Sequence, residues 1–314
     1  MILAVTHGSD EHAPPLLAAL AARGERCARF DAASFPRRAA LRMRQGADGA
    51  EAVLQVEGEP PVTAAEVRAV WWRRVRMPEL HPEISDPAHR QFAWDECEHA
   101  LGAFWLALAG ARWVNPLGAD RDAHRKPHQL ATARAAGLEV PRTLVTNDPD
   151  AARAFVEELG GPGRVLYKPF TGSAELWREA RLLRPEELAL LPALRYAPVI
   201  FQEYVPGLDL RATVVGERVF TCRIDARETA YPVDWRLDPE RARFEAVGLP
   251  AAVERRLLAL HRTLGLRYGA ADLRETPDGR AVFLEVNPGG QWLFVERRTG
   301  LQLTDALAGL LAGG

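Results

Sequence analysis

Residues 269–291 of the 314-residue chain read GAADLRETPDGRAVFLEVNPGGQ, and this stretch decides the fold. Two runs of β-forming residues flank residues 277–280 (PDGR), whose composition is typical of the turn of a β-hairpin. If the turn is centred in the middle of PDGR, Asp272 lies directly opposite Glu285. Asn287 then points to the same face as Glu285, because side chains alternate along a strand.

Two carboxylates opposed on one face of a hairpin repel each other, and a hard divalent cation reverses the sign of that interaction. Mg²⁺ takes oxygen ligands, usually one or two protein carboxylates together with substrate phosphates and water. Asp272, Glu285 and Asn287 supply three oxygens. The alternative is a solvated hairpin whose acids pair with Arg274 or Arg280. The many apolar residues of the stretch favour the metal site. We also expect that removing one of the opposed charges leaves the fold intact.

Two of the 40 basic residues are lysines, at positions 126 and 168. Lys168 ends the apolar run 165–169 (VLYKP) and precedes the small residues 171–173, a setting suited to a buried anionic ligand. An ammonium fits there because it is a compact point charge, whereas a guanidinium is a broad planar fork. Lys126 opens a helix within HRKPHQL and, taken alone, is as well explained as a surface charge.

Residues 199–211 (VIFQEYVPGLDLR) predict a strand that breaks at Pro206-Gly207. Backbone groups at Glu203–Val205 would be exposed there, where they can bind a flat heterocycle. Asp209 and Arg211 share a face of the next strand, so that the acid can hold a ribose and the arginine a phosphate. Each element is weak alone. Their order along the chain is informative: two lysines, a hinge, an acid with an arginine, and then the carboxylate hairpin.

Hydrophobic patterning predicts three units, at residues 1–118, 119–198 and 199–314. The first is an α/β unit that opens with a strand at Ile2–Thr6 and carries a long helix over 86–108, with Phe92 on its broad apolar face. The second opens with a helix that ends at Gly137. The third holds several strands, a helix over 251–264 and the carboxylate hairpin.

The composition excludes several classes of protein. A formal net charge of −2 argues against a general nucleic-acid binder, which would carry a basic excess. The longest uncharged apolar stretch, residues 100–111, is too short to cross a membrane. Three widely spaced cysteines without a CxxC pair predict reduced thiols in a cytoplasmic protein.

Over about residues 112–300 the chain resembles the ATP-grasp superfamily of ATP-dependent carboxylate ligases. The segments that carry the resemblance are NPLGADRDAHRKPHQL, VLYKPFTGS, FQEYVPGLDLR and ADLR…FLEVNPGGQW. It implies an α/β fold with an N-terminal Rossmann-like domain, a central α/β domain and a C-terminal antiparallel-sheet lid domain. It also implies binding of ATP and Mg²⁺, with two ions expected and Mn²⁺ as an alternative.

The resemblance assigns a role to each candidate residue. Lys126 and Lys168 would contact the nucleotide phosphates. The hinge would contact the adenine through Gln202, Glu203, Tyr204 and Val205, and Asp209 would contact the ribose. The hairpin would hold Mg²⁺ through Asp272, Glu285 and Asn287.

Within the superfamily the chain is similar to graspetide (microviridin-type) peptide ligases, through VWWRR at 70–74, RKPHQL, GLEVPRTLVTN and YPVDWR at 231–236. Such enzymes join Glu or Asp side chains of a ribosomal precursor peptide, which has a leader and an acidic core, to Ser, Thr or Lys side chains as macrolactones or macrolactams. The implied mechanism activates the carboxylate as an acyl phosphate. Candidates for gripping the γ-phosphate and the substrate carboxylate are Arg211, Arg223 and Arg236. Arg73 and Arg74 either bind an acidic substrate segment or a partner subunit, or cap a strand end.

Two other functions stay open. A ligase of the glutathione-synthetase or glutamate-tailing kind would add an amino acid to a small molecule or to a protein C-terminus. A nucleotide-binding scaffold without turnover is disfavoured by the complete set of Asp272, Glu285 and Asn287. We expect no nucleic-acid or membrane partner, and a homodimer is one alternative for the assembly.

Overall fold

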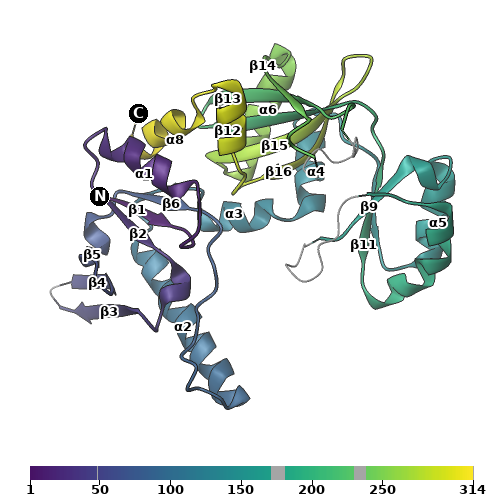
Figure 1. Cartoon of the computed structure of the whole chain (residues 1–314). Helices are drawn as coiled ribbons and strands as arrows, with labels where there is room; N and C mark the ends of the chain where they lie inside the picture. The colour runs from purple at the N-terminus through teal and green to yellow at the C-terminus, as the bar shows by residue number, and fades with distance from the viewer. Residues whose placement is uncertain (48, 171–180, 230–237, 314) are drawn as a thin grey trace.

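A computed structural model of the chain describes residues 1–47, 49–170, 181–229 and 238–313. Within these ranges the strands form four sheets, and helices pack against them in a mixed α/β architecture, as predicted (Figure 1). Three of the sheets follow one another along the chain, and the fourth is formed by β3–β5 (residues 39–63), inserted between strands of the first. The boundaries predicted near residues 118 and 198 stay predictions.

The N-terminal part is built on a parallel sheet in the order β2-β1-β6-β7. Its first strand is buried along its whole length, as expected for a parallel strand covered on both faces. Its strands and helices are β1 (Ile2–Val5), α1 (Ala13–Ala21), β2 (Cys27–Phe30), the short helix η1 (Ala32–Ser34), β6 (Ala69–Trp72), α2 (Pro87–Ala107) and β7 (Arg112–Val114).

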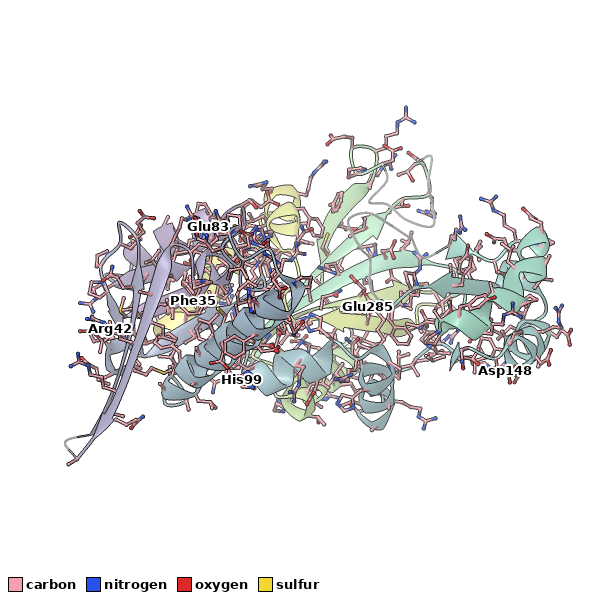
Figure 2. The ribbon with its side chains drawn as sticks, turned by 90° about the horizontal axis from the view of Figure 1, so that it is seen from below. Phe35, Arg42, Glu83, His99, Asp148 and Glu285 are labelled. Carbon is pink, nitrogen blue, oxygen red and sulfur yellow. The ribbon has the colours of Figure 1, made fainter. Side chains whose placement is uncertain are left out.

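A smaller antiparallel sheet flanks this unit, and the hairpin of its two long strands, which carries Arg42, projects from the molecule (Figure 2). Its elements are β3 (Ala39–Gly46), β4 (Gly49–Val56), β5 (Val62–Thr63) and the short helix η2 (Ala64–Glu66). The prediction for Phe92 was wrong: its side chain is 67% exposed, because the outer end of α2 extends beyond the sheet.

The central part is an antiparallel sheet in the order β10-β9-β11-β8. The single helix predicted to end at Gly137 is two helices, and Pro127 in the first turn of the second one explains where it begins. The elements are α3 (Leu117–Ala123), α4 (Lys126–Ala135), β8 (Thr143–Thr146), α5 (Pro149–Glu158), η3 (Pro162–Arg164), β9 (Val165–Lys168), β10 (Arg181–Leu182), η4 (Pro185–Tyr196) and β11 (Val199–Glu203).

The C-terminal part is a five-stranded antiparallel sheet in the order β14-β13-β12-β15-β16. One face packs on a helix that ends, as predicted, at Gly265 in the left-handed conformation. The elements are β12 (Leu208–Val215), β13 (Arg218–Asp225), β14 (Arg243–Val247), α6 (Ala251–Leu264), β15 (Tyr268–Glu275), β16 (Ala281–Asn287), α7 (Leu293–Thr299) and α8 (Leu303–Ala312). None of the helices in the described ranges is long and apolar enough to cross a membrane.

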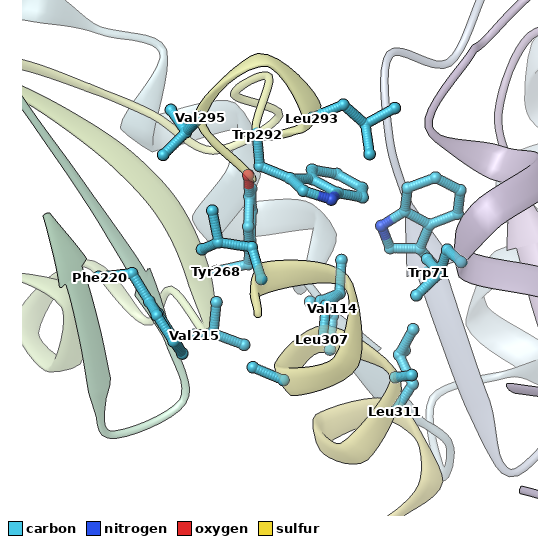
Figure 3. Close-up of a cluster of buried hydrophobic side chains, with 14 of the residues drawn as sticks. Trp71, Val114, Val215, Phe220, Tyr268, Trp292, Leu293, Val295, Leu307 and Leu311 are labelled. Carbon is cyan, nitrogen blue, oxygen red and sulfur yellow. The ribbon is translucent and has the colours of Figure 1, made fainter. Parts of the chain in front are cut away.

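A hydrophobic core joins the first and last parts of the chain. Trp71 on β6 meets Trp292 edge-on, with ring centroids 6.0 Å apart, and Tyr268 meets the other side of Trp292 edge-on at 5.7 Å (Figure 3). Leu307 and Leu311 of α8 complete this core. The N-terminal sheet therefore packs, through Trp71, against Trp292, which follows the end of β16.

The carboxylate hairpin has the predicted pairing at Asp272 and Glu285, but a different turn. Beyond these residues the partners are offset by one, because the strands are joined across Thr276 and Arg280 and a β-bulge follows Asp272. The bulge restores the register that the turn would shift. The predicted pairing of Asp272 with Glu285 is correct because the three-residue turn and the β-bulge shift the register in opposite directions.

Candidate functional site

The side chains of Asp272, Glu285 and Asn287 meet on one face of the hairpin. The Asn287 amide donates to Glu285 Oε1 at 3.2 Å and to Asp272 Oδ2 at 3.4 Å. Figure 2 shows Glu285 near the middle of the molecule, between the N-terminal part that carries Phe35 and the central sheet near Asp148. The hairpin thus presents two carboxylates and an amide between the parts of the chain.

Each carboxylate has a cation of its own. Lys126 Nζ lies 3.1 Å from Glu285 Oε2, and Arg211 Nη1 donates to Asp272 Oδ1 at 2.7 Å. Burial alone would raise the pKa of Glu285, but Lys126, Lys168 and Asn287 lower it to about 2. Burial alone would likewise lower the pKa of Arg211, and Asp272 raises it above its ordinary value. Glu285 and Arg211 are therefore charged at neutral pH, and because each carboxylate lies beside a cation the expectation of uncompensated repulsion needs revision.

The two alternative partners named for these acids lie elsewhere. Arg274 pairs with Asp209 at 3.0 Å, and Arg280 donates to Asp278 at 2.7 Å in the turn. The solvated-hairpin interpretation therefore does not describe this site.

Both lysines reach the site from structured elements. Lys126 is the first residue of α4, and Gln129 fixes this helix to β16 by exchanging hydrogen bonds with the backbone of Val286, at 2.8 and 2.9 Å. Lys168 ends β9 and donates to the buried Gln202 of β11 at 3.1 Å. Gln202 in turn donates to Thr143 at 3.0 Å, so its amide orientation is set.

The hinge after β11 departs in part from the prediction. The N–H of Glu203 donates to the carbonyl of Arg142 at 2.8 Å, and the N–H of Tyr204 donates to that of Arg164 at 2.9 Å. These two donors are used within the protein, which leaves the N–H of Val205 and the hinge carbonyls as the candidate contacts for a heterocycle.

The hinge backbone is held close to β15. A Cβ on Gly207 would lie 2.1 Å from the carbonyl oxygen of Glu275, and its φ of +151° also favours glycine. Arg274, which pairs with Asp209, donates to the carbonyl of Gly207 at 3.2 Å. The predicted ribose acid is therefore fixed beside the hinge.

One of the three candidate arginines, Arg223, lies away from the site. Arg223 neighbours Cys222, the partner of Arg211 in the sheet, so its side chain points to the opposite face. There it donates to both carboxylate oxygens of Glu275, at 2.7 and 3.0 Å, which raises its pKa. Arg223 is thus an ion-pair residue on the far face of the sheet and not a phosphate ligand. Arg236 lies outside the described residues, as do residues 171–173 after Lys168.

The two adjacent arginines after β6, Arg73 and Arg74, lie in different environments. Arg73 is 2% exposed, so it cannot bind a substrate segment and the prediction for it was wrong. Arg74 is exposed, with a φ of 45° that is unusual for a residue other than glycine. An added Cβ on Gly289 would lie 3.7 Å from Arg74 Cγ, which places Arg74 beside the turn that follows the hairpin.

The residues present fit Mg²⁺. Two partly buried carboxylates and an amide form an all-oxygen donor set, and Mg²⁺ takes its remaining ligands from phosphates and water. No group of three or more His, Cys, Asp or Glu side chains suited to a metal occurs in the described parts of the chain. The set is thus too small to hold a metal by protein ligands alone, as expected where a nucleotide completes the shell.

Sequence reasoning missed two residues that shape the site. Asn115, which follows β7, donates to the carbonyl oxygens of Tyr268 at 2.8 Å and Pro288 at 3.1 Å. Gln129 anchors α4 to β16, as described above. Both are buried, where a polar side chain needs hydrogen-bond partners. The apolar residues around Asn115 are a signal in the sequence, whereas Gln129 lies among polar and charged residues and gives none.

Known structures resemble the whole chain. It is 31% identical to the macrocyclase MdnC of Microcystis aeruginosa MRC, which was crystallised with the precursor peptide MdnA; the match covers 100% of this chain and 99% of MdnC, with a TM-score of 0.89. It is 28% identical to the ATP-grasp ligase PsnB, solved with a minimal precursor, Mg and ADP; that match covers 99% of this chain and 96% of PsnB, with a TM-score of 0.81.

Sequence comparisons agree in part of the chain. The MvdD pre-ATP grasp domain matches residues 1–121. A D-alanine–D-alanine ligase of Azoarcus sp. (strain BH72) is 32% identical over 164 residues, 48% of this chain and 52% of that ligase. A probable alpha-L-glutamate ligase of Xanthomonas oryzae pv. oryzae (strain MAFF 311018) is 30% identical over 210 residues, 64% of this chain and 69% of that protein.

The chain thus spans about half the length of the first of these relatives and about two thirds of the second. The matches to MdnC and PsnB extend over nearly the whole of both chains. Taken with the geometry of the hairpin and its lysines, they show that this chain belongs to the ATP-grasp ligases, where it is similar to the peptide macrocyclases.

Proposed function

We propose that this protein is an ADP-forming ligase that activates Glu or Asp side chains of a ribosomal precursor peptide and joins them to hydroxyl or amine side chains. The observation that carries the proposal is the meeting of Asp272, Glu285 and Asn287 with Lys126 and Arg211 on one face of the hairpin. Such a cluster offers oxygen ligands for a metal and cations for phosphate in the same place. ATP is its natural ligand.

The reaction has two balanced steps. A substrate carboxylate oxygen bonds to the γ-phosphorus of ATP, and the bond to the β–γ bridging oxygen breaks, which gives an acyl phosphate and ADP. A hydroxyl or amine then bonds to the acyl carbon, loses its proton and expels phosphate, which leaves an ester or an amide. Catalysis of this kind rests on positioning and on neutralising charge, so no covalent enzyme nucleophile is needed.

Each residue of the site has a part in this scheme. Mg²⁺, held by Asp272, Glu285 and Asn287, would neutralise the phosphate oxygens. Lys126 and Lys168 hold the phosphates as compact cations. Arg211 holds the γ-phosphate or the substrate carboxylate, which suit its planar fork.

The remaining candidates hold the nucleoside. The backbone of the hinge at Glu203–Val205 takes the adenine, with Val205 as its donor. Gln202, which precedes the hinge, accepts from Lys168 and so helps to orient it. Asp209 takes the ribose, and its fixed position beside the hinge supports this. Arg236 stays a candidate for the substrate carboxylate.

The similar proteins favour a peptide substrate. MdnC is a macrocyclase with a bound precursor peptide, and PsnB was solved with a minimal precursor. By that likeness the partner here is a precursor peptide with a leader and an acidic core. Arg74 is the candidate to contact it, and its exposure supports this. We also propose that the site takes two Mg²⁺ ions, which Mn²⁺ can replace. A cytoplasmic location is in keeping with the three free cysteines. A homodimer is one alternative for the assembly.

A second function has support of its own. The match to a probable alpha-L-glutamate ligase covers 69% of that protein, so addition of an amino acid to a small molecule or protein C-terminus is the alternative. The two reactions differ in mass. Macrocyclisation removes one water from the peptide for each link, whereas amino-acid addition increases the mass of the acceptor.

The test is to incubate the protein with MgATP and acidic, Ser/Thr-rich peptides encoded beside its gene, and to follow ADP and peptide mass together. We expect ADP formation that depends on the peptide, with the loss of one water for each ADP formed. ATP consumption without water loss from any peptide would overturn the macrocyclase proposal. A mass increase with added glutamate would establish the alternative.

A further inference from the structure

The turn that follows the carboxylate hairpin, residues 288–291, is held by side chains at every carbonyl. Asn115 donates to the first carbonyl oxygen at 3.1 Å, and Arg73 Nη1 donates to the second and third at 2.6 and 2.8 Å. The Tyr268 hydroxyl also donates to the third at 2.8 Å, and Arg211 Nη2 donates to the fourth at 3.3 Å. Asn115 and Arg73 come from the N-terminal α/β unit, far away in sequence.

Arg73 is itself fixed on the N-terminal side. Its Nε donates to Asp10 Oδ2 at 3.1 Å, and its guanidinium lies 5.0 Å from the ring centroid of Trp292. Asp10 also accepts hydrogen bonds from Thr6 at 2.7 Å and from the backbone N–H of His12 at 3.1 Å. The guanidinium therefore bridges a buried carboxylate of one unit and two carbonyls of the other, and it cannot shift without breaking several hydrogen bonds.

Residues 288–291 determine the positions of two residues of the site, Asn287 and Arg211. The turn begins directly after Asn287, which contacts both hairpin carboxylates, and it carries the carbonyl that accepts from Arg211. Gly290 has no room for a side chain, because an added Cβ would lie 2.4 Å from Ala270 Cβ and 3.1 Å from Arg211 Nη2. A displaced turn would move Asn287 and Arg211 relative to Asp272.

We propose that Arg73 is a positioning residue for the MgATP site: by holding the carbonyls of Gly289 and Gly290 it keeps Asn287 and Arg211 aligned with Asp272. The role rests on the proposed function only in that MgATP binds at the hairpin. It makes the N-terminal unit a structural part of the nucleotide site. It also explains why Arg74 adopts a positive φ, because the chain must leave the buried Arg73 and turn sharply to the surface.

The test measures nucleotide binding without any peptide. The Kd of a fluorescent ADP analogue is measured with and without Mg²⁺ for the wild type, Arg73→Lys and Tyr268→Phe. Arg73→Lys keeps a positive charge beside Asp10 but loses the planar fork that spans two carbonyls. Tyr268→Phe removes one hydrogen bond to the same turn and leaves the charges unchanged, so it serves if Arg73→Lys does not fold. The control is Leu54→Ala, in a fully buried position of β4 that belongs to a different core.

We expect Arg73→Lys to raise the Kd with Mg²⁺ at least tenfold and Tyr268→Phe to raise it severalfold. The Kd without Mg²⁺ should change less, because the turn acts on the metal ligand Asn287. Leu54→Ala should lower the melting temperature and leave both Kd values unchanged. Unchanged binding in folded Arg73→Lys or Tyr268→Phe would overturn the inference, as would an equal loss in Leu54→Ala. A wild type that binds no nucleotide would instead refute the proposed function.

Discussion

Replacing Asp272 with Asn is expected to destabilise the unliganded protein as well as to abolish turnover. Asp272 is the charge partner of Arg211, whose side chain is only 11% exposed, at a distance of 2.7 Å. Arg211 Nε is buried and finds no hydrogen-bond partner among the described residues, so the guanidinium depends strongly on its remaining contacts. Removing the carboxylate charge would leave a buried cation without its counter-ion.

The size of the effect follows from the burial of both partners. Breaking a fully buried ion pair from one side costs about 3–5 kcal/mol. The Asp272 side chain is 35% exposed, so solvent screens part of this interaction. Asn also keeps an oxygen that can accept from Arg211, and the loss of one charge eases the repulsion with Glu285. We therefore expect a loss of about 1–3 kcal/mol in the free energy of unfolding.

Urea unfolding without nucleotide measures this loss, with Asp278→Asn as the control. Asp278 is also a hairpin carboxylate paired with an arginine, but its side chain is 61% exposed and solvent screens the pair, so its replacement should cost much less stability than that of Asp272. Adding MgADP should then stabilise the wild type and fail to stabilise Asp272→Asn. If Asp272→Asn is as stable as the wild type or more stable, repulsion dominates and the argument from Arg211 fails.

Three further predictions concern the surroundings of the site. Lys168→Arg should lose at least tenfold in ADP formation, because the broader guanidinium does not fit beside Gln202 (3.1 Å); an enzyme of unchanged activity would show that a compact ammonium is not required. Gly207→Ala should lower the free energy of unfolding by about 1–3 kcal/mol in urea melts, because its Cβ would meet the Glu275 carbonyl at 2.1 Å; a smaller loss would mean that the hinge moves freely. Burial lowers the pKa of His261 from 6.5 to about 4, so between these pH values the unfolded state binds a proton that the folded state does not bind. The free energy of unfolding should therefore fall by up to about 3 kcal/mol as the pH drops from 6.5 to 4. A flat profile in that window, or the same slope in His261→Gln, would contradict this.

The meeting of Asp272, Glu285 and Asn287 on one face could be predicted from the sequence, because strand alternation and the position of the turn determine which residues face each other. An Asp and a Glu-x-Asn set on either side of a turn leave few arrangements that bring all three together. The turn itself could not be predicted in detail. A three-residue turn with Gly279 at a φ of +83° and a bulge after Asp272 give the same facing pair as the simpler hairpin, and sequence patterning does not distinguish them.

The arginines show where sequence reasoning stops. Arg211 and Arg223 both lie on strands near the hairpin, and only the cross-strand register reveals that they occupy opposite faces. Arg73 and Arg74 are adjacent and chemically equal, yet one is buried and the other exposed. What separates them is the tertiary contact with residues 288–291, which no local pattern encodes. Long arginine side chains are especially hard to place, because they serve equally as ligands, as surface charges and as buried anchors.

The ion pairs of the site connect its stability with its chemistry. Lys126 faces Glu285 and Arg211 faces Asp272, so each carboxylate expected to hold the metal is neutralised by a cation expected to hold phosphate. Opposed carboxylates would otherwise destabilise the hairpin whenever the ligand is absent. Within these two ion pairs, as in the whole chain, positive and negative charges nearly balance. The residues proposed to bind the ligand are thus also expected to stabilise the hairpin without it, and for that reason a single change at Asp272 tests both roles at once.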